Sequence, residues 1–298
     1  MSLLILSIVF VSFGQLLNAV IVLVDKYVVT QTAISRPITY AFFVGALSAT
    51  ATLLLPFGVI HAPSLSTVWL SLAIGVTFIV SLIFLFSALR IAQATDVIMW
   101  LAVISTITTF ILDLFLLNEN LPKFFPYALA LLILGLLLVG HFRFNSKSFF
   151  FVLVAGILFG FSTVLLKILF ADSSFLDGFF WSRMGNVAVA LPILLIPQFR
   201  RSILESSRQS SHRTSLLVVF NRILGGIAFL SILYAIRIGP VSIVNALASL
   251  QFVFLFLLVF LFRKKMPNLF AHEFRPGHVA HKIFAVLFIV AGFFVLFI

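Results

Sequence analysis

The chain has 298 residues, of which 63% are hydrophobic and only 9% are charged. A soluble domain usually carries about 25% charged residues because its surface faces water, so this composition excludes a soluble globular enzyme, a disordered tail and a nucleic-acid-binding module. The formal net charge is +11, and the Lys and Arg residues lie mostly between apolar runs, which is typical of charges that flank membrane helices and not of a phosphate-binding surface.

A helix needs about 20 predominantly apolar residues to cross a bilayer, because its backbone polar groups must be bonded inside the segment. Ten segments meet this requirement. In chain order they are residues 3–24, 38–55, 68–89, 97–117, 124–140, 149–170, 179–196, 216–236, 241–262 and 283–298. Turn chemistry such as Arg36-Pro37 and Gly239-Pro240 separates most of them. The sequence therefore predicts an all-α integral membrane protein with ten transmembrane helices.

The two halves of the chain align with each other, including at charged and turn residues that apolar bias does not explain. The matched pairs are Lys26 with Lys167, Pro56 with Pro197, Arg90 with Arg237, and Gly135 with Gly292. Each half holds five predicted helices, and an odd number of crossings reverses the direction of the second copy in the membrane. The sequence therefore predicts two inverted five-helix repeats, residues 1–141 and 149–298.

Two short motifs lie between predicted helices. Residues 117–121 (LNENL) are similar to a Leu-Gly-Glu-x-Leu signature between a fourth and a fifth helix, and residues 234–242 are similar to a hinge between an eighth and a ninth helix. With the two five-helix halves, these motifs resemble the EamA-like family of the drug/metabolite transporter superfamily. Residues 263–266 (RKKM) depart from that family, which usually repeats its Glu there. The resemblance implies ten helices around a central cavity and alternating access without ATP.

The predicted function is a secondary transporter, and more specifically an exporter, of a small organic metabolite in the cell membrane. Its expected partners are the lipid bilayer and a small-molecule substrate, without nucleic acid, cofactor or enzymatic activity, and the chain is expected to be a monomer or a homodimer. One alternative is transport of phosphorylated or nucleotide-linked sugars, because cations outnumber acids in the predicted spans. Another is a non-transporting protein, either a lipid scramblase or a membrane enzyme.

Ionisable side chains inside a span cost about 2.5–3.5 kcal/mol each on insertion scales, so they usually face a partner or a wet cavity. Arg222 lies inside the eighth predicted helix, where it either binds an anionic substrate or snorkels to the interface. Lys167, Arg183 and Asp113 are expected near one membrane face. There Arg183 either forms a structural ion pair with Asp113 or joins a substrate or proton site.

Uncharged polar side chains extend the predicted cavity. Gln15 and Asn18 are three residues apart and share a helix face that either lines the cavity or bonds a neighbouring helix. Asn245 is predicted to point inward, because an unbonded amide is costly in hydrocarbon. The remaining cavity candidates are Lys26, Tyr40, Trp100, Trp181 and Tyr234, of which the aromatic ones alternatively form an interface belt. No metal site is predicted, because cysteine and metal-ligand spacings are absent from the sequence.

The connections after odd-numbered predicted helices hold most of the 19 Lys and Arg residues, whereas the alternate connections hold only Lys123 and Arg237. Short cytoplasmic loops collect Lys and Arg, so the charge count predicts that both termini lie outside. The family resemblance implies the reverse orientation.

Overall fold

The computed structural model describes residues 3–31, 36–117, 119–139, 145–209, 212–262 and 276–295, and within these ranges the chain contains helices and no strand. In chain order the elements are α1 (Leu3–Gln31), α2 (Pro37–Leu47), the 3₁₀ helix η1 (Ser48–Phe57), α3 (Leu65–Ile91), α4 (Ala94–Leu112), the π-helical turn η2 (Asp113–Leu117), α5 (Phe125–Val139), α6 (Ser146–Ala171), α7 (Phe175–Ala190), η3 (Leu191–Leu195), α8 (Pro197–Gln209), α9 (His212–Ile238), α10 (Val241–Ala246), η4 (Leu247–Ser249), α11 (Leu250–Phe262) and α13 (Pro276–Val295). The all-helical prediction is confirmed.

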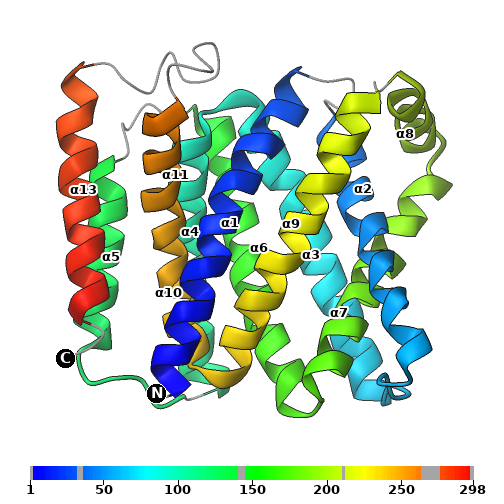
Figure 1. The fold of residues 1–298 in the computed structure, drawn as a ribbon, viewed down its shortest axis with the longest axis horizontal. Coiled ribbons are helices and arrows are strands. Elements are labelled where there is room, and N and C mark those ends of the chain that lie inside the picture. Colours follow the sequence, from blue (N-terminus) through cyan, green and yellow to red (C-terminus); the bar gives the residue numbers. More distant parts are fainter. Residues whose placement is uncertain are drawn as a thin grey trace.

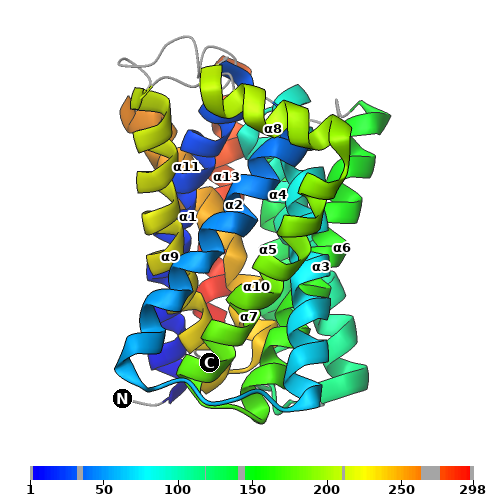
Figure 2. The ribbon, with the colours of Figure 1, turned by 90° about the vertical axis from the view of Figure 1, so that its right-hand side faces the viewer.

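Eight helices in the described ranges are long and apolar enough to cross a membrane, and two shorter apolar helices, Phe125–Leu138 and Phe284–Val295, accompany them. The chain is therefore an integral membrane protein. Its helices stand side by side in one bundle (Figure 1). α1 begins and α13 ends at the same end of the bundle, here called the terminal end, and α8 lies across the opposite end, the α8 end (Figure 2).

The helix α8 differs from the sequence analysis, which leaves residues 197–215 as a connection. This segment is too polar to span the bilayer, but its apolar and polar residues separate onto two faces. Ile203 packs into the core, and the hydroxyls of Ser202 and Thr39 lie 3.0 Å apart. Such an amphipathic helix is stable on a membrane surface when its apolar face covers the ends of the spanning helices. Arg200, Arg201, Glu205 and Arg208 therefore belong to this surface helix, whereas Arg213 belongs to α9.

Close packing between helices depends on glycine. On α3 and α7, a Cβ atom added to Gly185 would lie 1.9 Å from the Ser71 carbonyl oxygen, and one added to Gly75 would lie 2.3 Å from the Gly185 carbonyl oxygen. Small residues allow helix backbones to approach this closely in a membrane, where van der Waals packing drives association. The α3 and α7 backbones are therefore in direct contact.

The helices α5 and α13 pack through a reciprocal contact. Gly135 of α5 faces Ile289 of α13, and Gly292 of α13 faces Leu132 of α5. Residue numbers that rise along one helix fall along the other, so the two helices are antiparallel. The contact also relates the two glycines that the sequence alignment matches.

Two apolar clusters form most of the core. One includes Val28, Phe86 and Val218 and lies nearer the α8 end, and the other includes Ile8, Phe125 and Leu233 and lies nearer the terminal end. Between the two clusters the bundle is hollow.

Candidate functional site

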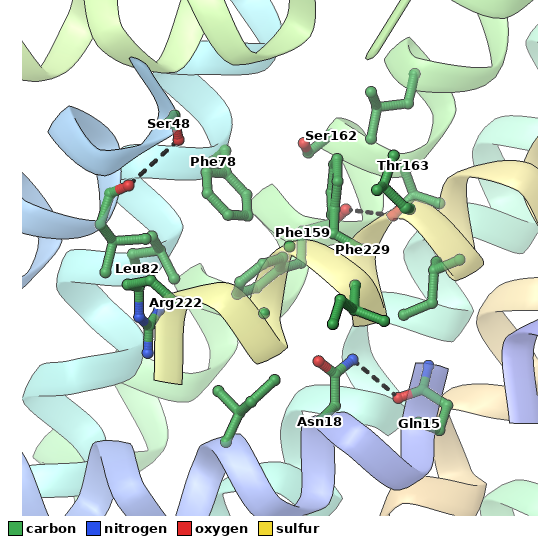
Figure 3. Close-up of a pocket in the computed structure, with 18 of the residues that line it drawn as sticks. Gln15, Asn18, Ser48, Phe78, Leu82, Phe159, Ser162, Thr163, Arg222 and Phe229 are labelled. Carbon is green, nitrogen blue, oxygen red and sulfur yellow. Dashed lines mark hydrogen bonds between the residues drawn. The ribbon is translucent and has the colours of Figure 1, made fainter. Parts of the chain in front are cut away.

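A cavity of about 750 Å³ lies in the middle of the bundle, with most of its lining apolar or aromatic (Figure 3). The polar residues that line it are Gln15, Asn18, Asp25, Ser48, Thr50, Ser105, Ser162, Thr163, Arg183, Arg222, Asn245 and Gln251. Gln15 and Asn18 lie on one wall, and the rings of Phe78, Phe159 and Phe229 lie across from them (Figure 3). Cavities of this size and lining are typical of small-molecule sites.

A buried ion pair closes the cavity toward the α8 end. Asp25 of α1 pairs with the Arg222 guanidinium of α9, and the same carboxylate oxygen accepts a hydrogen bond from the Tyr40 hydroxyl of α2 (2.5 Å). Asn221 Nδ2 donates to that oxygen at 2.8 Å, and Arg222 Nη2 donates to the Tyr40 hydroxyl at 2.9 Å. These four residues, called the Asp25 cluster, tie α1, α2 and α9 together. The hydrogen bonds offset part of the cost of removing both charges from water.

The cavity has an exposed edge along one side of the bundle. α2 and α9 meet at the Asp25 cluster and diverge toward the terminal end (Figure 1). The exposed apolar side chains of the lining are Leu53 of η1 and Val219, Ile223, Ile227 and Leu230 of α9, so the exposed edge runs along α9 on both sides of Arg222. Gly226 also lines this opening, and a Cβ added to it would meet nothing within 4 Å. The opening therefore lies between η1 and α9.

Lys26 and Lys167 occupy matching positions outside the cavity lining. Lys26 Nζ donates to the carbonyl oxygens of Leu89 (2.6 Å) and Ala92 (2.7 Å) at the C-terminus of α3. Lys167 Nζ donates to those of Ile236 and Gly239, both at 2.8 Å, at the C-terminus of α9. A cation satisfies the unbonded carbonyls at a helix C-terminus. α3 ends at the α8 end and α9 ends at the terminal end, so the two contacts lie at opposite ends of the bundle.

Glu119 joins the Lys167 contact at the terminal end. Its carboxylate lies 2.8 Å from Lys167 Nζ and accepts a hydrogen bond of 2.6 Å from the Val241 backbone N–H at the start of α10. Asp113 accepts a hydrogen bond from the Ser242 hydroxyl. The acidic residue of the LNENL motif therefore neutralises a cation and caps a helix at the same time.

The predicted ion pair between Asp113 and Arg183 is wrong. Asp113 is bonded to Ser242 and to the Glu119 backbone N–H (3.3 Å). Arg183 instead lies against aromatic rings in the cavity, with its guanidinium carbon 3.4 Å from the Phe229 ring centroid. Asp113 lies at the end of α4, whereas Arg183 lies in the middle of α7 beside the cavity, so the two side chains meet different neighbours.

Five of the eleven predicted cavity residues line the cavity: Gln15, Asn18, Arg183, Arg222 and Asn245. Asn18 Nδ2 donates to Gln15 Oε1 at 3.3 Å, and Asn245 Nδ2 donates to the Ser105 carbonyl at 2.9 Å. Gln15 and Asn18 therefore line the cavity, and the hydrogen bond between their side chains lies within α1 and does not join a neighbouring helix. Arg222 neither snorkels nor stands free for an anion, because its charge is paired with Asp25.

Six predicted residues lie elsewhere, and the cavity prediction is wrong for them. Lys26 and Lys167 cap helices as described, and Tyr40 belongs to the Asp25 cluster behind the lining. Trp100 packs edge-on against Phe149, with ring centroids 5.5 Å apart. Trp181 Nε1 donates to the His61 carbonyl at 3.2 Å near the terminal end, and Tyr234 packs against Phe10 and Phe175. Packing against neighbouring helices, and not cavity access, fixes these side chains.

Sequence reasoning missed Asp25, Gln251 and the four phenylalanines of the cavity lining. Asp25 carried a detectable signal, because an acid inside an apolar helix needs a partner. The phenylalanines carried none, since 38 Phe residues are spread over the chain. Residues 263–266 and 268–275, the departing motif and most of the polar segment after it, lie outside the described residues.

No family model and no curated protein matches the chain. A solved structure described only as "Crystal structure of protein" is similar to it, with a TM-score of 0.67 and 17% sequence identity over 96% of this chain and 98% of that chain. At this identity the likeness concerns the fold alone. It covers nearly the whole length of both chains, so the similarity of fold extends over the whole helical bundle.

Proposed function

We propose that the chain is a secondary transporter of a small organic metabolite and works by alternating access between two inverted five-helix repeats. The antiparallel contact of α5 with α13 supports the repeat, because it relates Gly135 to Gly292 reciprocally. Lys26 and Lys167 support it as well, since each caps the third membrane-length helix of its own half and the two contacts lie at opposite ends of the bundle. In transporters built this way, the substrate site lies near the bilayer midplane between the repeats.

The observation that carries the proposal is a central cavity that is closed toward the α8 end and exposed along one side of the bundle. The Asp25 cluster closes it toward the α8 end, and the opening lies between η1 and α9. A bundle that alternates between two such arrangements moves a bound molecule across the membrane without ATP, driven by a gradient or by substrate concentration. Membership of the EamA-like family, export and residence in the cell membrane belong to the same proposal.

The alternative of a phosphorylated or nucleotide-linked sugar as substrate has less support, because pairing with Asp25 removes Arg222 from the free cations of the cavity. A metabolite flux assay tests the proposal. Proteoliposomes containing the purified chain are loaded with a defined mixture of amino acids, carboxylates, nucleosides and sugar phosphates, and efflux is followed by mass spectrometry. We expect faster efflux of at least one compound than from liposomes without protein.

Two variants separate transport from leakage. Gly226→Trp places an indole in the opening of the cavity, where there is room for it, and should abolish efflux while the protein stays folded. Phe220→Trp makes a similar change on the exposed face of α9 outside the lining and should transport normally. Movement of labelled lipid without metabolite efflux would favour a scramblase, and equal efflux from both variants would contradict transport through this cavity.

A further inference from the structure

One charged side chain in the cavity has no partner of opposite charge. Arg183 lines the cavity and is partly buried, and its Nη2 atom is enclosed without a hydrogen-bond partner. Among the residues that the structure describes, it forms neither an ion pair nor a hydrogen bond. Its guanidinium carbon lies 3.4 Å from the ring centroid of Phe229 and 5.6 Å and 6.0 Å from those of Phe179 and Phe78.

The acids of the surrounding spans are already engaged. Asp25 pairs with Arg222, Glu119 pairs with Lys167, and Asp113 accepts a hydrogen bond from Ser242. The cation–π contacts compensate only part of the cost of burying a guanidinium, because they supply no negative charge. A charge left in this state inside a membrane protein marks a place where a ligand supplies the missing partner.

The contact of Arg183 with the Phe229 ring does not use the N–H donors of the guanidinium. A guanidinium carbon 3.4 Å from a ring centroid lies against the face of that ring, whereas the N–H bonds lie in the plane of the guanidinium. The ring therefore orients the group without using its N–H donors, and two parallel N–H bonds match the two oxygens of a carboxylate. Phe78 packs against Phe159 and Phe229, and these three rings form an aromatic wall of the cavity (Figure 3).

We propose that Arg183 and this aromatic wall bind an organic monoanion, namely a carboxylate on an apolar body about the size of an aromatic ring. One uncompensated cation neutralises one negative charge, which favours a carboxylate over a phosphate ester with two charges. The inference deepens the proposed function, because a ligand held at this site would be the transported substrate. Only the statement that the ligand is transported rests on the proposed function, since binding is measured separately.

The test is a binding titration on the whole chain in nanodiscs, by calorimetry, with benzoate and its neutral isostere benzamide. We expect benzoate to bind at least about tenfold more tightly than benzamide. Arg183→Gln should remove this preference. Arg183→Lys keeps the charge but lacks the two parallel N–H donors, so it should retain only part of the preference. The matched control is Arg237→Gln, because Arg237 is exposed, lies 6.0 Å from the Phe175 ring and does not line the cavity.

The comparison of benzoate with benzamide needs no variant, so the proposal stays testable even where a substitution impairs folding. Equal binding of the two compounds, no binding of benzoate, or unchanged benzoate binding by Arg183→Gln would each overturn the anion site. Metabolite efflux together with any of these results would leave the transporter proposal standing. Arg183-dependent benzoate binding without efflux of any metabolite would instead retain the site and contradict transport.

Discussion

Removing one charge of the Asp25–Arg222 pair should destabilise the protein by about 3 kcal/mol, because the remaining charge is left buried without a partner. Arg222→Met leaves the Asp25 carboxylate with only the Tyr40 and Asn221 hydrogen bonds. Asp25→Leu leaves the guanidinium with the Tyr40 hydroxyl alone, since its Nε atom already lacks a hydrogen-bond partner. The measurement is the free energy of unfolding in mixed micelles, followed by loss of helical circular dichroism.

The double variant Asp25→Leu/Arg222→Met provides the control. Replacing both members of a buried pair by apolar residues of similar volume is often neutral, so the double variant should recover most of the loss. If the two single losses simply add in the double variant, the two charges do not stabilise each other and the closure of the α8 end needs another explanation.

Substituting Gly185 should have an effect at least as large. A Cβ atom at this position would lie 1.9 Å from the Ser71 carbonyl oxygen, which belongs to the backbone of α3 and cannot rotate away. Gly185→Val therefore forces α3 and α7 apart, and we expect a loss of about 3 kcal/mol or more, or failure to fold. Monodispersity in detergent and the thermal unfolding midpoint measure the effect.

Gly226→Ala is the matched glycine control. Its Cβ would meet nothing within 4 Å, and alanine in a helix interior is favoured over glycine by about 0.5–1 kcal/mol. The unfolding midpoint should therefore stay unchanged or rise. A loss of similar size in both glycine variants would show that helix propensity or expression, and not the α3–α7 contact, causes the effect at Gly185.

The sequence was sufficient for the features that depend on composition and on repetition. Apolar length located the long apolar helices but not the polar helix α8, and the match of Lys26 with Lys167 led to two side chains that make the same kind of contact with helix carbonyls. The match of Gly135 with Gly292 led to a reciprocal helix contact. These features could be predicted because each follows from residues that are close in the sequence or from the alignment of the two halves of the chain.

The partners of the buried charges could not be predicted in this way. Asp25 and Arg222 are separated by 197 positions, and their pairing depends on how α1 and α9 are rotated about their own axes. Helices that are apolar on all sides carry little periodicity from which such a rotation could be read. The same limitation placed Arg183 beside Asp113 in the sequence analysis, whereas Phe229 of α9 faces it in the structure.

The central claim is that the two ends of the cavity open in alternation, and paired distance measurements test it most directly. The chain has no cysteine, so spin labels can be introduced without removing native residues. One pair, Thr50→Cys with Ile227→Cys, spans the opening between η1 and α9, and another, Arg36→Cys with Ser215→Cys, reports on α2 and α9 at the α8 end.

Electron–electron distances of both pairs are measured in nanodiscs, with and without the metabolites that the flux assay identifies. Alternating access predicts two populations for each pair, and a condition that shortens the Thr50–Ile227 distance should lengthen the Arg36–Ser215 distance. Distances that change together, or a single unchanged population at both ends while metabolite crosses the membrane, would contradict the account.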